Sequence, residues 1–81
     1  MTLSERKVVV YGRELCADTT RARAVLDARA VPYEYVDVAA DDASRSHAAG
    51  LAGSANIPVL LFGDGTVLVE PSDAELIAAL R

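Results

Sequence analysis

The sequence predicts an α/β fold in which a four-stranded mixed sheet is combined with three helices. Three observations lead to this fold class. Apolar runs and helical patterns follow the order strand, helix, strand, helix, hairpin, helix; the first strand is almost wholly aliphatic; and a Gly-Asp-Gly turn joins the last two strands. Because 81 residues supply only one small core, we expect a single domain over residues 1–81.

The first half of the chain predicts a parallel strand pair joined by a helix. Three consecutive valines place the first strand at Lys7–Tyr11, buried on both faces. A helix is expected from Asp18 to Ala30, ended by Val31-Pro32, and a strand from Tyr33 to Val38 should then run parallel to the first. The helix has an apolar face formed by Ala22, Val25 and Leu26. Its charged side chains, expected in water, are Arg21, Arg23, Asp27 and Arg29.

The second half predicts a helix, a hairpin and a final helix. The helix is expected from about Ala39 to Ala52, closed by glycines at 50 and 53. Its core side should hold Ala43, His47, Ala48 and Leu51. Strands at Val59–Phe62 and Thr66–Glu70 flank the 63–65 turn and form an antiparallel hairpin. A capping box, Ser72 with Glu75 three residues later, begins the last helix.

The charge balance limits the kinds of molecule that we expect as partners. Twelve acidic residues against eight basic ones leave a net charge of -4, which argues against nucleic acid or an anionic membrane as the main partner. No stretch is long and apolar enough to span a bilayer, and Met1–Lys7 lacks a hydrophobic signal core, so we expect a cytoplasmic monomer. His47, the only histidine, has no neighbours at ligand spacing, and we expect no metal site.

Cys16 is the only cysteine, and it follows an apolar strand and a short loop at the expected start of a helix. Unpaired N–H groups and the positive end of the helix dipole stabilise a thiolate at such a position and lower the pKa of the thiol. A small buried hydrophobic residue is the alternative interpretation of the same cysteine. A single cysteine excludes an intrachain disulfide, so any disulfide must form with another molecule.

Several motifs together resemble the glutaredoxins, which have a minimal thioredoxin fold, over the whole chain. They are Val8-Val9-Val10-Tyr11 before a loop ending in Cys16, Val36-Asp37-Val38, Ile57-Pro58-Val59, and an acidic helix start after the fourth strand. Pro71-Ser72 is similar to the small actinobacterial glutaredoxins, including mycoredoxins, where it replaces a Gly-Gly pair. The departure is Cys16-Ala17-Asp18-Thr19, which lacks the second cysteine of Cys-x-x-Cys and differs from the Cys-Gly-Phe-Ser motif of monothiol glutaredoxins.

The resemblance implies a monothiol thiol-disulfide oxidoreductase. Cys16 would be the nucleophile that attacks a mixed disulfide, and resolution would come from a low-molecular-weight thiol, glutathione or mycothiol, as co-substrate. No bound cofactor is implied. The expected substrates are protein mixed disulfides.

Two residues beside the cysteine are implicated by the same resemblance. Arg13 occupies the place of a family lysine that pairs with the glycine carboxylate of glutathione, and a planar guanidinium suits a carboxylate. A solvated loop cation, with or without an ion pair to Glu14, is the alternative. Thr19 would donate its hydroxyl to the Cys16 thiolate, or would be an ordinary residue of the first helical turn.

Two further pairs of residues would contact substrate in this family. Pro58 matches a cis-proline, and Ile57 before it would offer its backbone to the substrate peptide as an added strand. At the start of the last helix, Ser72 and Asp73 would present N–H groups to the α-carboxylate of a bound thiol. Helix capping is the alternative role of Ser72.

Two other functions remain open at this point. The changes at Asp18 and Thr19 fit a redox-inactive thioredoxin-fold module that recognises a partner peptide around Cys16, Ile57 and Pro58. An iron–sulfur carrier formed by two chains and two external thiols is weakened by the motif difference.

Overall fold

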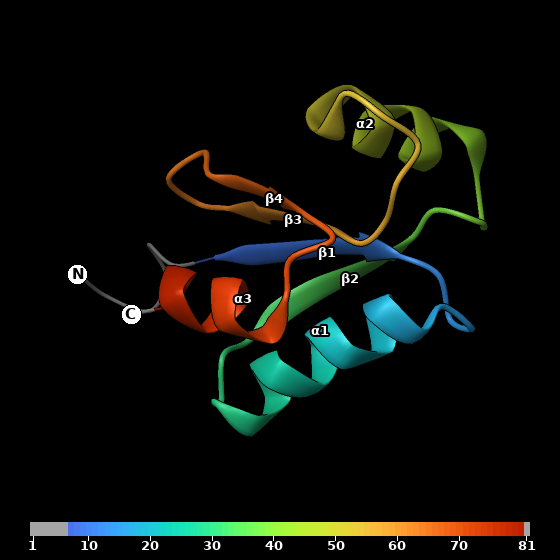
Figure 1. The fold of residues 1–81 in the computed structure, drawn as a ribbon. Helices are drawn as coiled ribbons and strands as arrows, with labels where there is room; N and C mark the ends of the chain where they lie inside the picture. The colour runs from blue at the N-terminus through green and yellow to red at the C-terminus, as the bar shows by residue number, and fades with distance from the viewer. Residues whose placement is uncertain (1–6, 81) are drawn as a thin grey trace.

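The computed structural model describes residues 7–80 and confirms the predicted order of elements and the thioredoxin-like fold (Figure 1). In chain order the elements are β1 (Val8–Gly12), α1 (Ala17–Ala28), β2 (Tyr33–Asp37), α2 (Asp42–Ala52), β3 (Val59–Phe62), β4 (Val67–Val69) and α3 (Asp73–Ala79). The expectation about a signal core at the N-terminus lies largely outside the described residues. No helix within residues 7–80 is long and apolar enough to cross a membrane.

The four strands form one mixed sheet in the order β2-β1-β3-β4. β1 runs parallel to β2, with Val8 opposite Tyr33, as the crossover through α1 requires. β1 is antiparallel to β3, and β3 is antiparallel to β4 across the predicted turn. The aliphatic strand β1 therefore lies inside the sheet, where strands on both sides satisfy its backbone.

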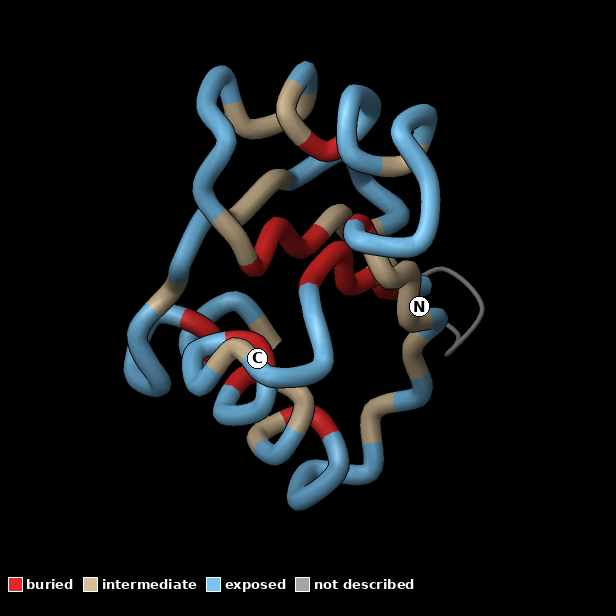
Figure 2. The backbone as a smooth tube through the Cα atoms, turned by 90° about the vertical axis from the view of Figure 1, so that its right-hand side faces the viewer, coloured by how far each residue is buried: buried red, intermediate tan, exposed pale blue. Residues whose placement is uncertain are grey.

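Helices cover both faces of the sheet, with α1 and α3 on one face and α2 on the other (Figure 1). The core on the α1–α3 face consists of Val8, Val10, Ala22, Leu26, Leu60 and Leu76. The core on the α2 face consists of Tyr11, Val38, Ala48 and Val59. Figure 2 shows that the buried backbone is concentrated in the central strands and in the inner sides of the helices. A small domain thus divides its apolar burial between two layers around one sheet.

Two helix ends differ by two or more residues from the predicted bounds, and each has a local cause. α1 stops at Ala28 because Ala30 adopts φ 56°, and the N–H of Val31 donates to Leu26 O at 2.9 Å in a Schellman-type end. α2 begins at Asp42, three residues later than predicted, because the Asp41 side chain caps it by accepting the Ser44 N–H at 2.7 Å. At its other end Gly53 closes the helix in the left-handed conformation, as predicted, whereas Gly50, also expected at the helix end, lies inside α2.

The predicted core side of the second helix is partly wrong. Ala48 is buried and Leu51 is half-buried, but Ala43 and His47 are exposed. The His47 ring nevertheless contacts Tyr11, with 5.6 Å between ring centroids. Few large apolar side chains on α2 reach the sheet, so this face of the molecule is covered less deeply than the α1–α3 face.

Candidate active site around Cys16

Cys16 occupies the N-cap position of α1, at the end of the loop that follows β1. The residue as a whole is half-buried, so it is not part of the enclosed core. Its backbone is fixed on both sides, because its N–H donates to Arg13 O at 3.3 Å and its C=O accepts from the Thr20 N–H at 3.0 Å. The thiol is therefore presented by a defined turn at a helix start.

Thr19 is the main influence on the Cys16 thiol. Its hydroxyl, and next its backbone N–H, stabilise the thiolate and lower the pKa of Cys16 below the ordinary value of 9.0. The Asp18 N–H acts in the same direction, while burial and the Asp18 carboxylate oppose it. The thiol makes no ordinary cap hydrogen bond. We therefore attribute the lowered pKa to donors that favour the charged sulfur, which is the effect expected at a helix N-terminus.

Thr19 also holds the loop in place. It is only 1% exposed, and its Oγ1 accepts the Arg13 N–H at 3.5 Å. A Cβ added to Gly12 would lie 2.4 Å from Thr19 Cγ2, so the strand and the helix approach each other more closely here than any other residue at position 12 allows. Thr19 thus joins the end of β1, the loop and the sulfur.

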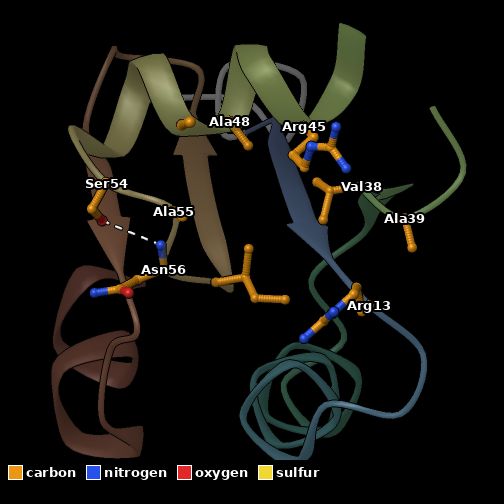
Figure 3. A pocket seen from close by; sticks show the side chains of 10 residues that line it. Arg13, Val38, Ala39, Arg45, Ala48, Ser54, Ala55 and Asn56 are labelled. Carbon is orange, nitrogen blue, oxygen red and sulfur yellow. Dashed lines mark hydrogen bonds between the residues drawn. The ribbon is translucent and has the colours of Figure 1, made fainter. Parts of the chain in front are cut away.

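A pocket of about 290 Å³ lies beside this loop, beneath α2 (Figure 3). Its charged side chains are Arg13 from the loop and Arg45 from α2, and both are seen on the side of the pocket where Val38 lies. Asn56 and Ile57 line it from the segment before β3. Two guanidinium groups with an amide nearby provide donors for an anion such as a carboxylate.

The two arginines of the pocket differ in their partners. Arg45 Nη2 forms an exposed ion pair with Asp42 Oδ1 on its own helix. Within residues 7–80 no carboxylate lies within ion-pair distance of Arg13, and Glu14, its expected partner, pairs with Arg23 instead. The suggested Arg13–Glu14 pair is therefore not formed, whereas the exposure of Arg13 also fits the alternative of a solvated loop cation. Its guanidinium is available to a ligand.

Arg23 does not point into water as the helical pattern predicted. Its Cζ lies 4.0 Å from the centroid of the Tyr35 ring, its Nε donates to the Tyr33 hydroxyl at 3.1 Å, and its Nη1 contacts Glu14 Oε2 at 3.2 Å. One guanidinium therefore connects β2, α1 and the loop that carries Cys16. Among the described residues the buried Tyr35 hydroxyl has no hydrogen-bond partner, and burial, with the Glu14 carboxylate nearby, raises the pKa of Tyr35 to about 12.

The remaining predicted site residues divide into two groups. Ile57 lines the pocket, and the Ile57–Pro58 peptide bond is cis, as the resemblance implied. Ser72 and Asp73 do not line this pocket, and the capping box uses the Ser72 N–H, which donates to Glu75 Oε1 at 2.8 Å. A ligand at the start of α3 would thus have the N–H groups of Asp73 and Ala74 rather than that of Ser72.

The pocket includes residues that the sequence analysis did not identify. Arg45 and Asn56 have no local motif, and their role follows only from the packing of α2 beside the segment before β3. No cluster of three or more His, Cys, Asp or Glu residues capable of holding a metal occurs within the described part of the chain.

Comparison with known proteins identifies the relationship. The sequence model of the Glutaredoxin family matches residues 8–67, which include the loop, Cys16 and the cis-proline. The chain belongs to the glutaredoxin family. The match ends before Ser72 and Asp73, so it does not cover the start of α3. Glutaredoxins are thiol-disulfide oxidoreductases that act on mixed disulfides of glutathione with proteins, and they use glutathione-type thiols as co-substrates.

Solved structures agree with this fold. The glutaredoxin of Archaeoglobus fulgidus superposes with a TM-score of 0.80 at 19% identity, covering 100% of this chain and 96% of its own. A mutant of the thioredoxin-like protein BC3987 gives a TM-score of 0.81 at 26% identity, over 91% and 99% of the two chains. The glutaredoxin of Brucella melitensis gives a TM-score of 0.71 at 21% identity, covering 93% of this chain and 78% of its own. A search of curated proteins gives no significant match.

Proposed function

We propose that this glutaredoxin is a monothiol oxidoreductase that uses Cys16 as its nucleophile. The observation that carries the proposal is the position of the half-buried Cys16 at the start of α1, where Thr19 lowers the pKa of its thiol. A lower pKa increases the thiolate fraction near neutral pH, and the thiolate is the attacking species. Since Thr19 occupies the place of the second cysteine in Cys-x-x-Cys, the reaction must be completed by an external thiol.

The proposed cycle has two exchange steps. In the first, the Cys16 thiolate attacks the small-thiol sulfur of a protein mixed disulfide, the existing S–S bond breaks, and the protein thiolate leaves and takes a proton from solvent. Cys16 is then disulfide-linked to the small thiol. In the second, the thiolate of another small thiol attacks that linked sulfur, which releases the symmetrical small-thiol disulfide and regenerates the Cys16 thiolate. The incoming small thiol is therefore the reductant: its sulfur ends oxidised in the symmetrical disulfide, and the protein sulfur ends as a thiol.

The pocket favours glutathione over mycothiol as the small thiol. Arg13 and Arg45 offer two cationic forks, and a carboxylate is the group that such forks bind most specifically. Glutathione carries carboxylates, whereas mycothiol has none. Ile57, beside the cis-proline, would offer its backbone to the same thiol peptide. At the start of α3, the N–H groups of Asp73 and Ala74 are proposed for a second carboxylate of the ligand, since the Ser72 N–H already donates to Glu75. Mycoredoxin-type use of mycothiol is the competing outcome.

A redox-inactive binding module is the second candidate. Two observations favour it: the resolving cysteine is absent, and the Asp18 carboxylate opposes ionisation of Cys16. Such a module would bind a partner peptide in the same groove, around Ile57 and Pro58, without exchange. In either case we propose a cytoplasmic monomer, as the sequence analysis predicts.

Reduction of a peptide–glutathione mixed disulfide, with glutathione or mycothiol as reductant, tests the proposal. We expect turnover with glutathione, no turnover by Cys16→Ser, and a several-fold higher KM for glutathione in Arg13→Gln and in Arg45→Gln. Arg29→Gln is the matched control, since Arg29 is exposed at the far end of α1. Equal turnover by Cys16→Ser would remove Cys16 as the nucleophile. Faster turnover with mycothiol would overturn the assignment of the thiol.

A further inference from the structure

Leu15, the residue immediately before Cys16, is the most exposed large apolar side chain among the described residues. It is 102% exposed, so no other part of the chain shields it. The other large apolar side chain in the exposed class is Val69 in β4, at 36%. Isolated apolar residues on a surface are common, so exposure alone would say little. The position beside the nucleophile, on a restrained loop, is what distinguishes Leu15.

The loop that carries Leu15 is held from both sides. The Cys16 N–H donates to Arg13 O at 3.3 Å, and the Arg13 N–H donates to Thr19 Oγ1 at 3.5 Å. On the other side Glu14 is bound by Arg23 at 3.2 Å. Residues before and after Leu15 are thus tied to α1, and the leucine projects from a defined turn. Because the backbone on both sides of Leu15 is restrained, covering the leucine requires little additional ordering of the loop.

Two of the three charged residues nearest to Leu15 in the sequence are paired within the protein. Glu14 pairs with Arg23, and Asp18 pairs with Arg21 at 3.2 Å. Arg13 is directed to the pocket beneath α2, where the small thiol is proposed to bind. Around the sulfur, the surface left to a second molecule therefore offers an apolar contact rather than an unpaired charge. An apolar side chain is the chemistry that fits it.

We propose that Leu15 docks the protein half of the mixed disulfide, and that the favoured substrates carry a large apolar side chain next to the modified cysteine. The inference rests on the proposed function and deepens it by naming the substrate class. The small thiol and the protein would approach the sulfur from different sides, the first along the arginine pocket and the second over Leu15. Covering an exposed leucine with an apolar partner corresponds to a preference of about tenfold or more in kcat/KM.

Competing peptide substrates test this inference with the full chain. Two short peptides, each disulfide-linked to glutathione through one cysteine, differ only in having leucine or serine beside that cysteine. We expect the wild type to reduce the leucine peptide with a kcat/KM about tenfold higher. In Leu15→Ser this ratio should fall to near one, and in Leu15→Met most of it should remain. Val69→Ser, which removes the other exposed side chain, should keep the wild-type ratio.

A binding measurement separates this inference from the proposed catalysis. In Cys16→Ser, which cannot exchange, we expect the S-methylated leucine peptide to bind more tightly than the serine peptide, and Leu15→Ser on that background to remove the difference. If the wild type reduces neither peptide but this difference in binding is found, the docking role stands and the catalytic proposal fails. A wild-type enzyme that reduces both peptides equally, or a Leu15→Ser variant that keeps the preference, would overturn the docking role.

Discussion

The N-termini of α1 and α3 differ in how they use the unpaired backbone N–H groups of the first helical turn. At α3, the Ser72 side chain accepts the Glu75 N–H at 3.1 Å and the Glu75 carboxylate accepts the Ser72 N–H at 2.8 Å, so the helix caps itself. At α1, the N-cap is Cys16, whose side chain makes no such bond. One helix start uses its donors for stability, and the other leaves them for a thiolate.

The difference indicates where the domain gives up stability for reactivity. A serine at an N-cap stabilises a helix by about 0.5–2 kcal/mol relative to a residue that cannot cap. Cys16 forgoes most of this, and the donors at its helix start lower the thiol pKa instead. The nearby packing of Thr19 against Gly12 then holds the uncapped turn in shape.

Replacing the sulfur should have the largest effect on this contrast. Cys16→Ser should abolish reduction of mixed disulfides while raising the free energy of unfolding by about 0.5–1 kcal/mol, because serine is a good N-cap. Urea unfolding measures the second quantity. A loss of stability comparable to a core substitution would instead mean that Cys16 serves mainly in packing.

Disturbing the close approach behind the loop should have the next largest effect. Gly12→Ala forces a Cβ to within 2.4 Å of Thr19 Cγ2. We expect the free energy of unfolding to fall by about 1–3 kcal/mol and the alkylation of Cys16 to become slower. Gly50→Ala is the matched control, because a Cβ there meets nothing within 4 Å. Because Gly50 lies within α2, this change should raise the free energy of unfolding by about 0.5–1 kcal/mol. Equal effects of the two substitutions would contradict the role of Gly12.

Removing the Thr19 hydroxyl should affect the charge of the sulfur. In Thr19→Val the pKa of Cys16 should rise toward its ordinary value of 9.0, because the variant lacks the hydroxyl that lowers this pKa most. The pH dependence of iodoacetamide alkylation, or of thiolate absorbance, gives this pKa. Thr19→Ser keeps the hydroxyl and should keep the low pKa. If valine and serine variants titrate alike, the hydroxyl does not act on Cys16.

The cap of α3 should give the smallest effect, confined to stability. Ser72→Ala should cost about 0.5–2 kcal/mol. Hydrogen bonds from Ser72 hold the pKa of Glu75 below its ordinary value of 4.5, so the contribution of the carboxylate is complete above pH 4.5 and is lost as the pH falls through the folded-state pKa. Urea midpoints of wild type and Glu75→Gln measured across this range should therefore converge at the acid end. A constant gap would exclude the capping box as its source.

Much of the fold could be predicted because its signals are local. Three valines, a Gly-Asp-Gly turn and the Ser72–Glu75 box each act within a few residues, and the observed elements follow them closely. Two predicted helix bounds were wrong because other local interactions set where those helices begin or end. Asp41 rather than Ala39 starts α2, and a left-handed Ala30 stops α1 early.

The site was predicted in part, for a similar reason. The position of Cys16 at a helix start follows from the strand, loop and helix pattern around it. The contacts of Arg23 with two tyrosines and with Glu14 could not be predicted from a local sequence pattern, because these partners come from β2 and from the loop. A helical wheel assigns Arg23 to the solvent side and cannot show that a neighbouring strand lies within its reach.

From its residues alone, the chain determined the order of its strands and helices, the lone thiol at the first helix start and the self-capped last helix. These depend on backbone preferences and on side chains that interact within a few positions. Folding brought Arg13 and Arg45 to one pocket, buried Thr19 against Gly12 and left Leu15 in solvent beside the sulfur. The two arginines come from segments that are distant along the chain, and Thr19 meets Gly12 only where α1 packs against the end of β1, so these contacts exist only once the helices have packed on the sheet.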